Sequence, residues 1–193
     1  MEKRELKTKA KKGLSLQDLL LTAVLLAAGA VLKFFAGTFI NLFGMKPNFI
    51  IAMYCMAIVL IRPKIYYSII IGLLAGAICQ FFPGTPYLNF GSELAGALAM
   101  GLLIMIPAKN KTVEIVLAAV STFISTVISG GLYVVLLFVF IKSDPSAMVA
   151  YVPIVLGTAT LNTIIVALLY VPLMKVLKKP FISTPKEESS DNE

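Results

Sequence analysis

The sequence predicts an all-α protein that crosses a membrane six times. Hydrophobic residues make up 59% of its 193 residues, charged residues only 14%, and the mean hydropathy is +0.91. A soluble domain is nearer to half apolar and about a quarter charged. Apolar stretches of about 17 residues or more, the length that crosses the hydrocarbon layer, recur along the chain. Composition and recurrence together predict an integral membrane bundle.

Six apolar segments follow one another, separated by charge, proline or glycine. We expect spans over residues 16–36, 47–61, 65–82, 92–107, 113–141 and 150–174. Arg62-Pro-Lys64 ends the second span and Pro107-Ala-Lys-Asn-Lys111 the fourth, because proline cannot continue a helix and charge favours water. The fifth span is long, so we expect it to tilt or to break at Gly130-Gly131.

Positive charge is distributed unevenly between the two sides of this expected topology. Fourteen of the 17 Lys and Arg residues lie in the N-terminal segment, the 2–3 and 4–5 loops and the C-terminal end. The other side carries Lys33, Lys46 and Lys142. Because cytoplasmic loops are enriched in Lys and Arg, both termini are predicted inside the cell.

The expected organisation is one membrane domain between two polar tails. It consists of a basic cytoplasmic tail at 1–15, a six-helix domain at 16–178 and a polar cytoplasmic tail at 179–193. The N-terminal region is similar to a cleavable signal peptide, with basic residues before the Leu19–Ala30 run. We expect it to be retained, because the apolar stretch continues to Phe43.

Several kinds of chemistry find no motif in this sequence. It has no histidine, the commonest metal ligand and general base, and both cysteines, Cys55 and Cys79, fall inside apolar runs. It has no G-x-x-x-x-G-K-[ST] loop for ATP, and no H-E-x-x-H or G-x-S-x-G with a histidine partner. Neither a series of intramembrane acids nor an inverted repeat is evident. We therefore expect no enzyme, metal or cofactor, but a binding subunit whose energy comes from another protein.

Polar residues inside apolar segments are costly, so their positions are informative. Ser121, Ser125, Ser129 and Tyr133 recur every four residues on the fifth span. For the serines, hydrogen bonds to their own i−4 carbonyls are the favoured interpretation.

Three larger polar side chains need partners wherever they lie in hydrocarbon. Gln80 ends the third span, Glu93 opens the fourth after the Asn89-Phe90-Gly91 turn, and Asn162 shares a face of the sixth with Thr158. These groups are therefore better candidates for a site than the serines.

The outer side combines a cation, an anion, amides and aromatic rings. Lys46 lies on a short turn stiffened by Pro47, and Glu93 is the only acid near this side apart from Asp144. The amides and rings expected on the same side are Asn41, Asn48, Asn89, Asn162, Phe35, Phe39, Phe49, Tyr87 and Tyr133. This set suits a zwitterion with an apolar or aromatic body. A Lys46–Glu93 salt bridge without a ligand, or a lysine snorkelling to the membrane surface, would explain the charges equally well.

Small residues at four-residue spacing predict close contacts between helices. Ala23-xxx-Ala27 lies on the first span, Gly72-xxx-Gly76 on the third and Ala97-xxx-Gly101 on the fourth. In lipid such pairs let backbones approach closely. Contacts inside the bundle are favoured over a docking face for a partner.

Three short motifs resemble one family. Gly44-Met-Lys-Pro-Asn48, Arg62-Pro-Lys64, and Leu161-Asn-Thr-Ile-Ile165 running to Tyr170-Val-Pro172 are similar to the bacterial tryptophan transporter family. With six spans and both termini inside, the chain resembles the substrate-binding S component of an energy-coupling factor transporter. The resemblance covers about residues 16–178.

The resemblance implies a bacterial plasma-membrane subunit that captures tryptophan and docks on a transmembrane coupling protein with two cytoplasmic ATPases. Ala23 and Ala27 match the motif through which such subunits touch the coupling protein. The outer 1–2, 3–4 and 5–6 loops would enclose the substrate. The substrate-binding residues expected on this basis are Lys46 for the carboxylate, Glu93 or backbone carbonyls for the ammonium, Asn162 with Phe and Tyr rings for the indole, and Asn48, Asn89 and Tyr133 around them. An S component for a vitamin or other small molecule, a stand-alone secondary carrier, and a membrane enzyme or scaffold are the alternatives.

Overall fold

The computed structural model describes residues 13–39, 46–82, 85, 87–141, 145–179 and 181. These residues form α-helices and one short 3-10 helix, η1, and contain no strand: α1 (Leu16–Phe39), α2 (Ile50–Ile61), α3 (Ile65–Cys79), α4 (Leu88–Leu103), α5 (Lys111–Phe140), η1 (Pro145–Tyr151) and α6 (Val152–Val176). The all-helical prediction is confirmed. The expected break in the fifth segment is absent, because α5 runs unbroken through Gly130 and Gly131.

The six α-helices differ in length. Three segments are long and apolar enough to cross a membrane: Leu16–Phe35, Lys111–Phe140 and Ala147–Val176. The other three helices are apolar but shorter, with 12, 15 and 16 residues in α2, α3 and α4. At 1.5 Å per residue α2 covers about 18 Å, well short of the ~30 Å of a hydrocarbon layer.

The shortest helix, α2, is the centre of the bundle. Every residue from Ile50 to Leu60 is buried. The helix contacts each of the other five α-helices. A helix that is apolar on all sides is stable only when neighbours surround it. Asn48, in the non-helical segment that precedes α2, contacts Glu93 of α4 and Asn162 of α6.

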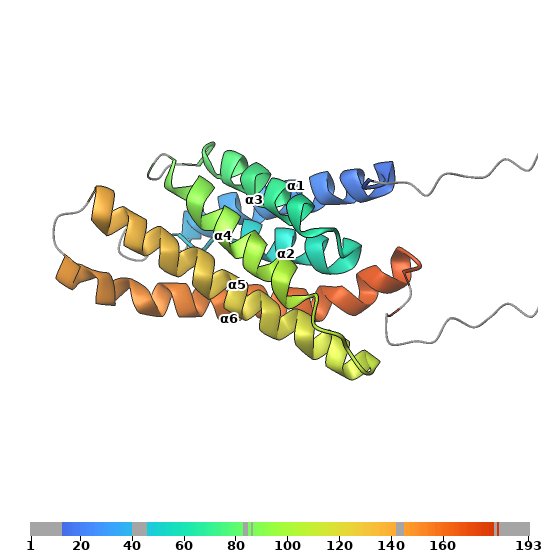
Figure 1. The fold of residues 1–193 in the computed structure, drawn as a ribbon. Helices are drawn as coiled ribbons and strands as arrows, with labels where there is room; N and C mark the ends of the chain where they lie inside the picture. Colours follow the sequence, from blue (N-terminus) through green and yellow to red (C-terminus); the bar gives the residue numbers. More distant parts are fainter. Residues whose placement is uncertain are drawn as a thin grey trace, which may run out of the picture.

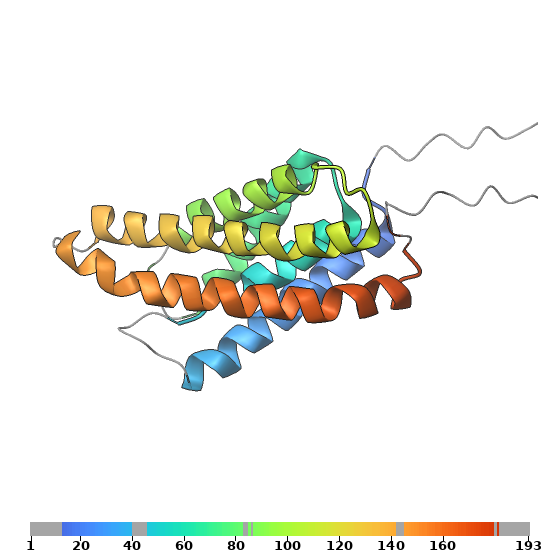
Figure 2. The same cartoon turned by 90° about the horizontal axis from the view of Figure 1, so that it is seen from below.

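The helices run alternately between the two ends of the bundle (Figure 1). The start of α1 and the end of α6 lie at one end, here called the terminal end, and α3 and α5 finish at the opposite end. The α5 and α6 helices lie side by side along their length, whereas α1 crosses the bundle obliquely (Figure 2).

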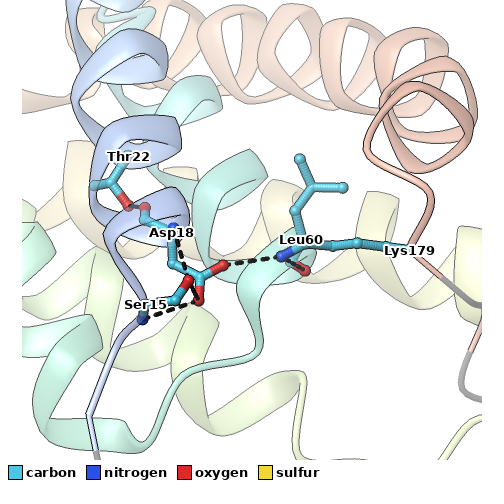
Figure 3. Close-up of polar contacts among 5 residues, drawn as sticks. All are labelled: Ser15, Asp18, Thr22, Leu60 and Lys179. Atoms are coloured by element: carbon cyan, nitrogen blue, oxygen red, sulfur yellow. Dashed lines mark hydrogen bonds and ion pairs between the residues drawn. The ribbon is translucent and has the colours of Figure 1, made fainter. Parts of the chain in front are cut away.

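At the terminal end, one lysine joins three helices. Ser15 and Asp18 cap α1 reciprocally, as the Ser15 hydroxyl donates to Asp18 Oδ2 at 2.7 Å and accepts from the Asp18 N–H at 3.1 Å. Asp18 also pairs with Lys179, at 3.1 Å (Figure 3). The same ammonium donates to the Leu60 carbonyl at the end of α2, again at 3.1 Å. The start of α1, the end of α2 and the residues after α6 are thereby held together.

A second polar group at the terminal end is centred on Glu114, which is fully buried. Its Oε1 lies 3.3 Å from an Arg62 guanidinium nitrogen and accepts from the Tyr170 hydroxyl at 2.9 Å. Arg62 also donates to the Ile104 carbonyl, at 3.1 Å. The end of α2, the start of α5 and the last turns of α6 are joined through this carboxylate.

Two of the three small-residue pairs pack inside the bundle, as predicted. A Cβ added at Gly72 would lie 2.9 Å from the Glu93 carbonyl oxygen, and one at Gly101 would lie 2.6 Å from the Ser68 hydroxyl oxygen. These glycines therefore set the close approach of α3 and α4. The same prediction was wrong for α1, because Ala23 and Ala27 are both exposed. Their face of α1 packs on no helix of the described bundle.

Candidate functional site

Glu93 is the buried carboxylate of the end opposite the termini. It lies in the second turn of α4 and is only 1% exposed. The Asn48 side-chain amide donates to Oε1, and the Ser129 hydroxyl donates to Oε2 at 3.1 Å. Both donors are neutral groups, so among the described residues the Glu93 carboxyl group has hydrogen bonds but no ion pair. Burying a carboxyl group without an ion-pair partner costs free energy of folding, so Glu93 is a candidate for a functional role.

Asn48 connects Glu93 to α6. It belongs to the non-helical segment before α2, and its backbone carbonyl accepts from the Asn162 side-chain amide at 3.1 Å. The same amide lies 3.4 Å from the Thr126 hydroxyl of α5. Non-helical backbone that is buried among helices requires hydrogen-bond partners of this kind. Asn162 therefore fixes the position of the segment that carries Asn48.

A thiol and a lysine extend this group toward α1. The Cys79 sulfur, at the end of α3, lies 3.9 Å from Glu93 Oε1 and 3.6 Å from the Asn48 amide nitrogen. The Lys33 ammonium lies 3.2 Å from the same sulfur and 5.1 Å from the centroid of the Phe82 ring. We call Asn48, Cys79, Glu93, Ser129 and Asn162 the Glu93 cluster; Lys33 lies at its edge.

The serines of α5 do not bond as the sequence suggested. The Ser125 hydroxyl donates to the Gly96 carbonyl of α4 at 2.7 Å, and Ser129 donates to Glu93. The i−4 carbonyls are used instead by Thr122 and Thr126, both at 2.8 Å. The prediction was wrong for Ser125 and Ser129 because their short side chains face α4 across a close helix contact, where another acceptor is within reach. It was also wrong for Ser121, whose buried hydroxyl has no hydrogen-bond partner among the described residues.

The structure brings some of the expected site residues together and leaves others nearby. Asn48, Glu93 and Asn162 form one connected group. Lys46 lies two residues before Asn48 and is half-buried, and Asn89 precedes Glu93 by one turn of α4. Tyr133 follows Ser129 by one turn of α5, and its hydroxyl donates to the Thr85 hydroxyl at 3.3 Å.

The ion pair between Lys46 and Glu93, which was the alternative explanation of these two charges, is not formed. In the part of the chain that the structure describes, the ion pairs are Arg62–Glu114 and Lys179–Asp18, both at the terminal end. Asn41, Lys142 and Asp144, which were expected on the same side as Glu93, lie outside the described residues.

Three residues of this region escaped the sequence interpretation. Ser129 was seen only as one member of a stripe, and Cys79 as a buried hydrophobe. Lys33 carried a usable signal, since it is the only charge after Asp18 in the first apolar stretch. Long-range packing of α1 on α2 and α3, which brings Lys33 to Cys79, is not encoded in any local pattern.

The geometry suits recognition of a polar group rather than covalent chemistry. Among the described residues no group of three or more His, Cys, Asp or Glu could hold a metal ion. Four buried side-chain oxygen atoms have no hydrogen-bond partner among the described residues: the hydroxyls of Tyr54, Ser68 and Ser121, and the side-chain carbonyl oxygen of Asn162 in the Glu93 cluster. A buried carboxylate and a buried amide oxygen can together accept several hydrogen bonds from a cationic or N–H-bearing molecule.

Comparison with known proteins gives the family. Over 171 residues the chain is 26% identical to a probable tryptophan transport protein of Clostridium acetobutylicum, covering 87% of this chain and 98% of that one. It is also 26% identical over 166 residues to a probable tryptophan transport protein of Bacillus subtilis, covering 84% and 94% respectively. No solved structure matches it. The model of the tryptophan transporter TrpP family matches residues 15–178, which include all six α-helices. The chain therefore belongs to the tryptophan transporter TrpP family, a family of transporters and not of enzymes.

Proposed function

We propose that this chain is the substrate-binding subunit of an ATP-driven importer and that its substrate is L-tryptophan. The observation that carries the proposal is the buried Glu93 carboxylate, held by the neutral donors Asn48 and Ser129 within an apolar bundle. A carboxylate in this setting is suited to the ammonium group of an amino acid, because a charged partner offsets the cost of burial. Membership of the tryptophan transporter TrpP family supports tryptophan as that amino acid.

Asn162 supports the indole ring as the second recognised group. Its side-chain amide is held by Asn48, whereas its carbonyl oxygen accepts no hydrogen bond within the described part of the chain. An indole N–H is donor-only and needs an acceptor when it is buried. We assign Asn162 Oδ1 as that acceptor. Lys46, Asn89 and Tyr133 would surround the ligand at the same end of the bundle.

The proposed orientation places the Glu93 cluster toward the outside of a bacterial plasma membrane. All six helices would cross it, the short ones completing their passage with non-helical backbone that is packed against protein. At the terminal end, the ends of the helices carry seven basic residues: Arg62, Lys64, Lys109, Lys111, Lys175, Lys178 and Lys179. The excess of lysine and arginine there supports a cytoplasmic location for that end and for the tails at 1–15 and 179–193.

Coupling to ATP would come from a transmembrane coupling protein and two cytoplasmic ATPases. The support is the exposed face of α1 around Ala23 and Ala27, flanked by Leu20 and Val24, which are 64% and 57% exposed. Small residues on a lipid-facing surface allow another helix to approach closely. This face would bind the coupling protein.

Binding is tested by titrating the purified chain in detergent with L-tryptophan. The protein contains no Trp, so excitation at the red edge of indole absorption reports the ligand's own fluorescence. Saturable one-to-one binding is expected. A correctly folded chain that gives no saturable signal with tryptophan, but does with a vitamin or another amino acid, would show that the substrate is wrong.

Coupling is tested separately, by uptake of labelled tryptophan into cells or vesicles. Uptake is expected only when the coupling protein and the ATPases are co-expressed. Ala23→Trp and Ala27→Trp should abolish assembly with the coupling protein while leaving tryptophan binding intact. Uptake by this chain alone would instead identify a stand-alone carrier.

A further inference from the structure

We propose that Lys33, rather than Lys46, binds the carboxylate of the amino-acid substrate, so that Lys33 and Glu93 recognise the two charges of one zwitterion. This inference rests on the proposed function and concerns the same site. It adds a residue from α1, and it assigns the ligand's carboxylate to the side of the cluster where α1 meets α3.

The first argument is the position of the ammonium group. Lys33 reaches from α1 to the Cys79 sulfur, at 3.2 Å, and that sulfur lies 3.9 Å from Glu93 Oε1. One thiol therefore separates the cation from the anion. A thiol sulfur is a weak hydrogen-bond acceptor and is a poor partner for an ammonium ion.

The second argument is that this cation and this anion lie near each other without pairing directly. Within the described residues both ion pairs are at the terminal end, and Glu93 is bonded to the neutral groups of Asn48 and Ser129. An amino acid carries its ammonium and carboxylate on one carbon atom. A zwitterion lying between Lys33 and Glu93, with its charges reversed relative to theirs, would convert two weakly compensated charges into two charge-assisted hydrogen bonds.

The third argument concerns the body of the substrate. The Phe82 ring lies 5.1 Å from the Lys33 ammonium, and Phe82 packs against the core. Asn162, with its unused carbonyl oxygen, donates to the backbone carbonyl of Asn48, whose side chain contacts Glu93. Three helices would thus bind different parts of tryptophan: α1 the carboxylate, α4 the ammonium group and α6 the indole N–H.

The test compares three ligands on five chains. The ligands are L-tryptophan, tryptamine, which lacks the carboxylate, and indole-3-propionate, which lacks the amino group. The chains are the wild type, Lys33→Met, Lys33→Arg, Lys46→Met and Lys64→Met. Lys64 is exposed at the terminal end and controls for the loss of one positive charge.

If Lys33 binds the carboxylate, Lys33→Met should lower the affinity for tryptophan by about tenfold or more, the cost of a lost charge-assisted hydrogen bond. Its affinity for tryptamine should not change, so the preference for tryptophan over tryptamine should collapse. Lys33→Arg and Lys64→Met should keep that preference. Lys46→Met should change the affinities for tryptophan and tryptamine by the same factor, because Lys46 would lie beside the ligand without binding its carboxylate. The assignment would be overturned if Lys33→Met kept the wild-type preference for tryptophan over tryptamine, or if Lys46→Met lost it. Tryptophan would remain the substrate in either case. A wild-type chain that binds no tryptophan would remove the proposed function and this inference together.

A second measurement does not depend on the folding of any Lys33 variant. In a Cys55→Ala chain the remaining thiol is Cys79, which is 2% exposed and contacts Lys33. Saturating tryptophan should slow its reaction with methyl methanethiosulfonate severalfold, because the ligand's carboxylate would lie beside the sulfur. An unchanged rate with tryptophan bound would place the ligand elsewhere and contradict the inference.

Discussion

Asn162 of α6 donates its side-chain amide to the backbone carbonyl of Asn48 at 3.1 Å, across 114 positions of sequence. This contact holds the non-helical segment before α2 in place, and the Asn48 side chain in turn donates to Glu93. The position of the proposed ammonium site on α4 therefore depends on a side chain of α6. A movement of α6 relative to α4 would therefore change the Asn162–Asn48 contact and the Asn48–Glu93 contact together.

Asn162→Leu should weaken both folding and ligand recognition. The leucine has the same branching but leaves the Asn48 carbonyl without this donor, which costs about 1–3 kcal/mol. Thermal unfolding in detergent measures the first effect. Thr160→Val is the matched control, because Thr160 is an exposed residue of α6 whose hydroxyl donates to the Leu156 carbonyl of the same helix, and it should change stability by less than about 0.5 kcal/mol.

The same variant tests the role of the Asn162 oxygen in binding. Wild type should prefer tryptophan over 1-methyltryptophan, which has no indole N–H, and Asn162→Leu should lose this preference. If the variant binds both ligands as the wild type does, Asn162 is only a structural residue.

Glu93→Gln should separate the charge of this residue from its packing. Glutamine keeps the volume, its carbonyl oxygen can accept from Asn48, and the Ser129 hydroxyl can rotate to accept from the new amide. Stability should therefore stay within about 1 kcal/mol of wild type, the net value of one hydrogen bond. Tryptophan affinity should fall by about tenfold or more, because a charge-assisted bond to the ligand's ammonium is worth about 1.5–3 kcal/mol.

Fluorescence titration and thermal unfolding together measure this prediction. Ser129→Ala is the control, since it removes a neutral donor to Glu93 but leaves the charge, and it should reduce affinity less than Glu93→Gln does. Equal affinity in wild type and Glu93→Gln would show that the carboxylate does not contact the ammonium group.

The helices were predictable because each is a long or strongly apolar segment bounded by charge or proline. The residues at which the helices begin and end were less predictable. Leu88 begins α4 well before Glu93, so the Asn89-Phe90-Gly91 segment expected as a turn is already helical. Local residue types there favour a turn, whereas packing of Phe90 against Gly76 of α3 favours the helix.

The residue types of the candidate site were predictable from the sequence, but the hydrogen bonds between them were not. A carboxyl group and two amides inside apolar segments require hydrogen-bond partners. In the structure Asn48 contacts both Glu93 and Asn162. Which lysine lies near the carboxylate could not be read from sequence, because Lys33 is brought there by the oblique crossing of α1. Lys46, closer to Asn48 along the chain, forms no ion pair with Glu93.

At the terminal end, the buried and the more exposed ion pair should contribute differently to stability. Glu114→Ala removes the partner of Arg62 and Tyr170 in a fully buried position and should cost about 3–5 kcal/mol. Lys179→Ala breaks a pair whose side chains are 28% and 22% exposed, and should cost about 1 kcal/mol or less. Thermal unfolding in detergent compares the two. Equal losses would mean that the Lys179 contact with the Leu60 carbonyl matters as much as the buried carboxylate.

The contact between α4 and α5 beside Glu93 can be tested with two glycines. A Cβ added at Gly96 would overlap the hydroxyl of the fully buried Tyr54 and lie 2.8 Å from the Ser129 Cβ, so Gly96→Ala should force the helices apart and destabilise by about 1–3 kcal/mol. Gly131 lies on α5, where no atom is within 4 Å of an added Cβ, and Gly131→Ala should stabilise by about 0.5–1 kcal/mol through helix propensity alone. Because Ser129 donates to Glu93, Gly96→Ala should also weaken tryptophan binding, whereas Gly131→Ala should not. Thermal unfolding and fluorescence titration on the same preparations measure both effects. A Gly96→Ala chain as stable as wild type would show that α4 and α5 are not in close contact at this level.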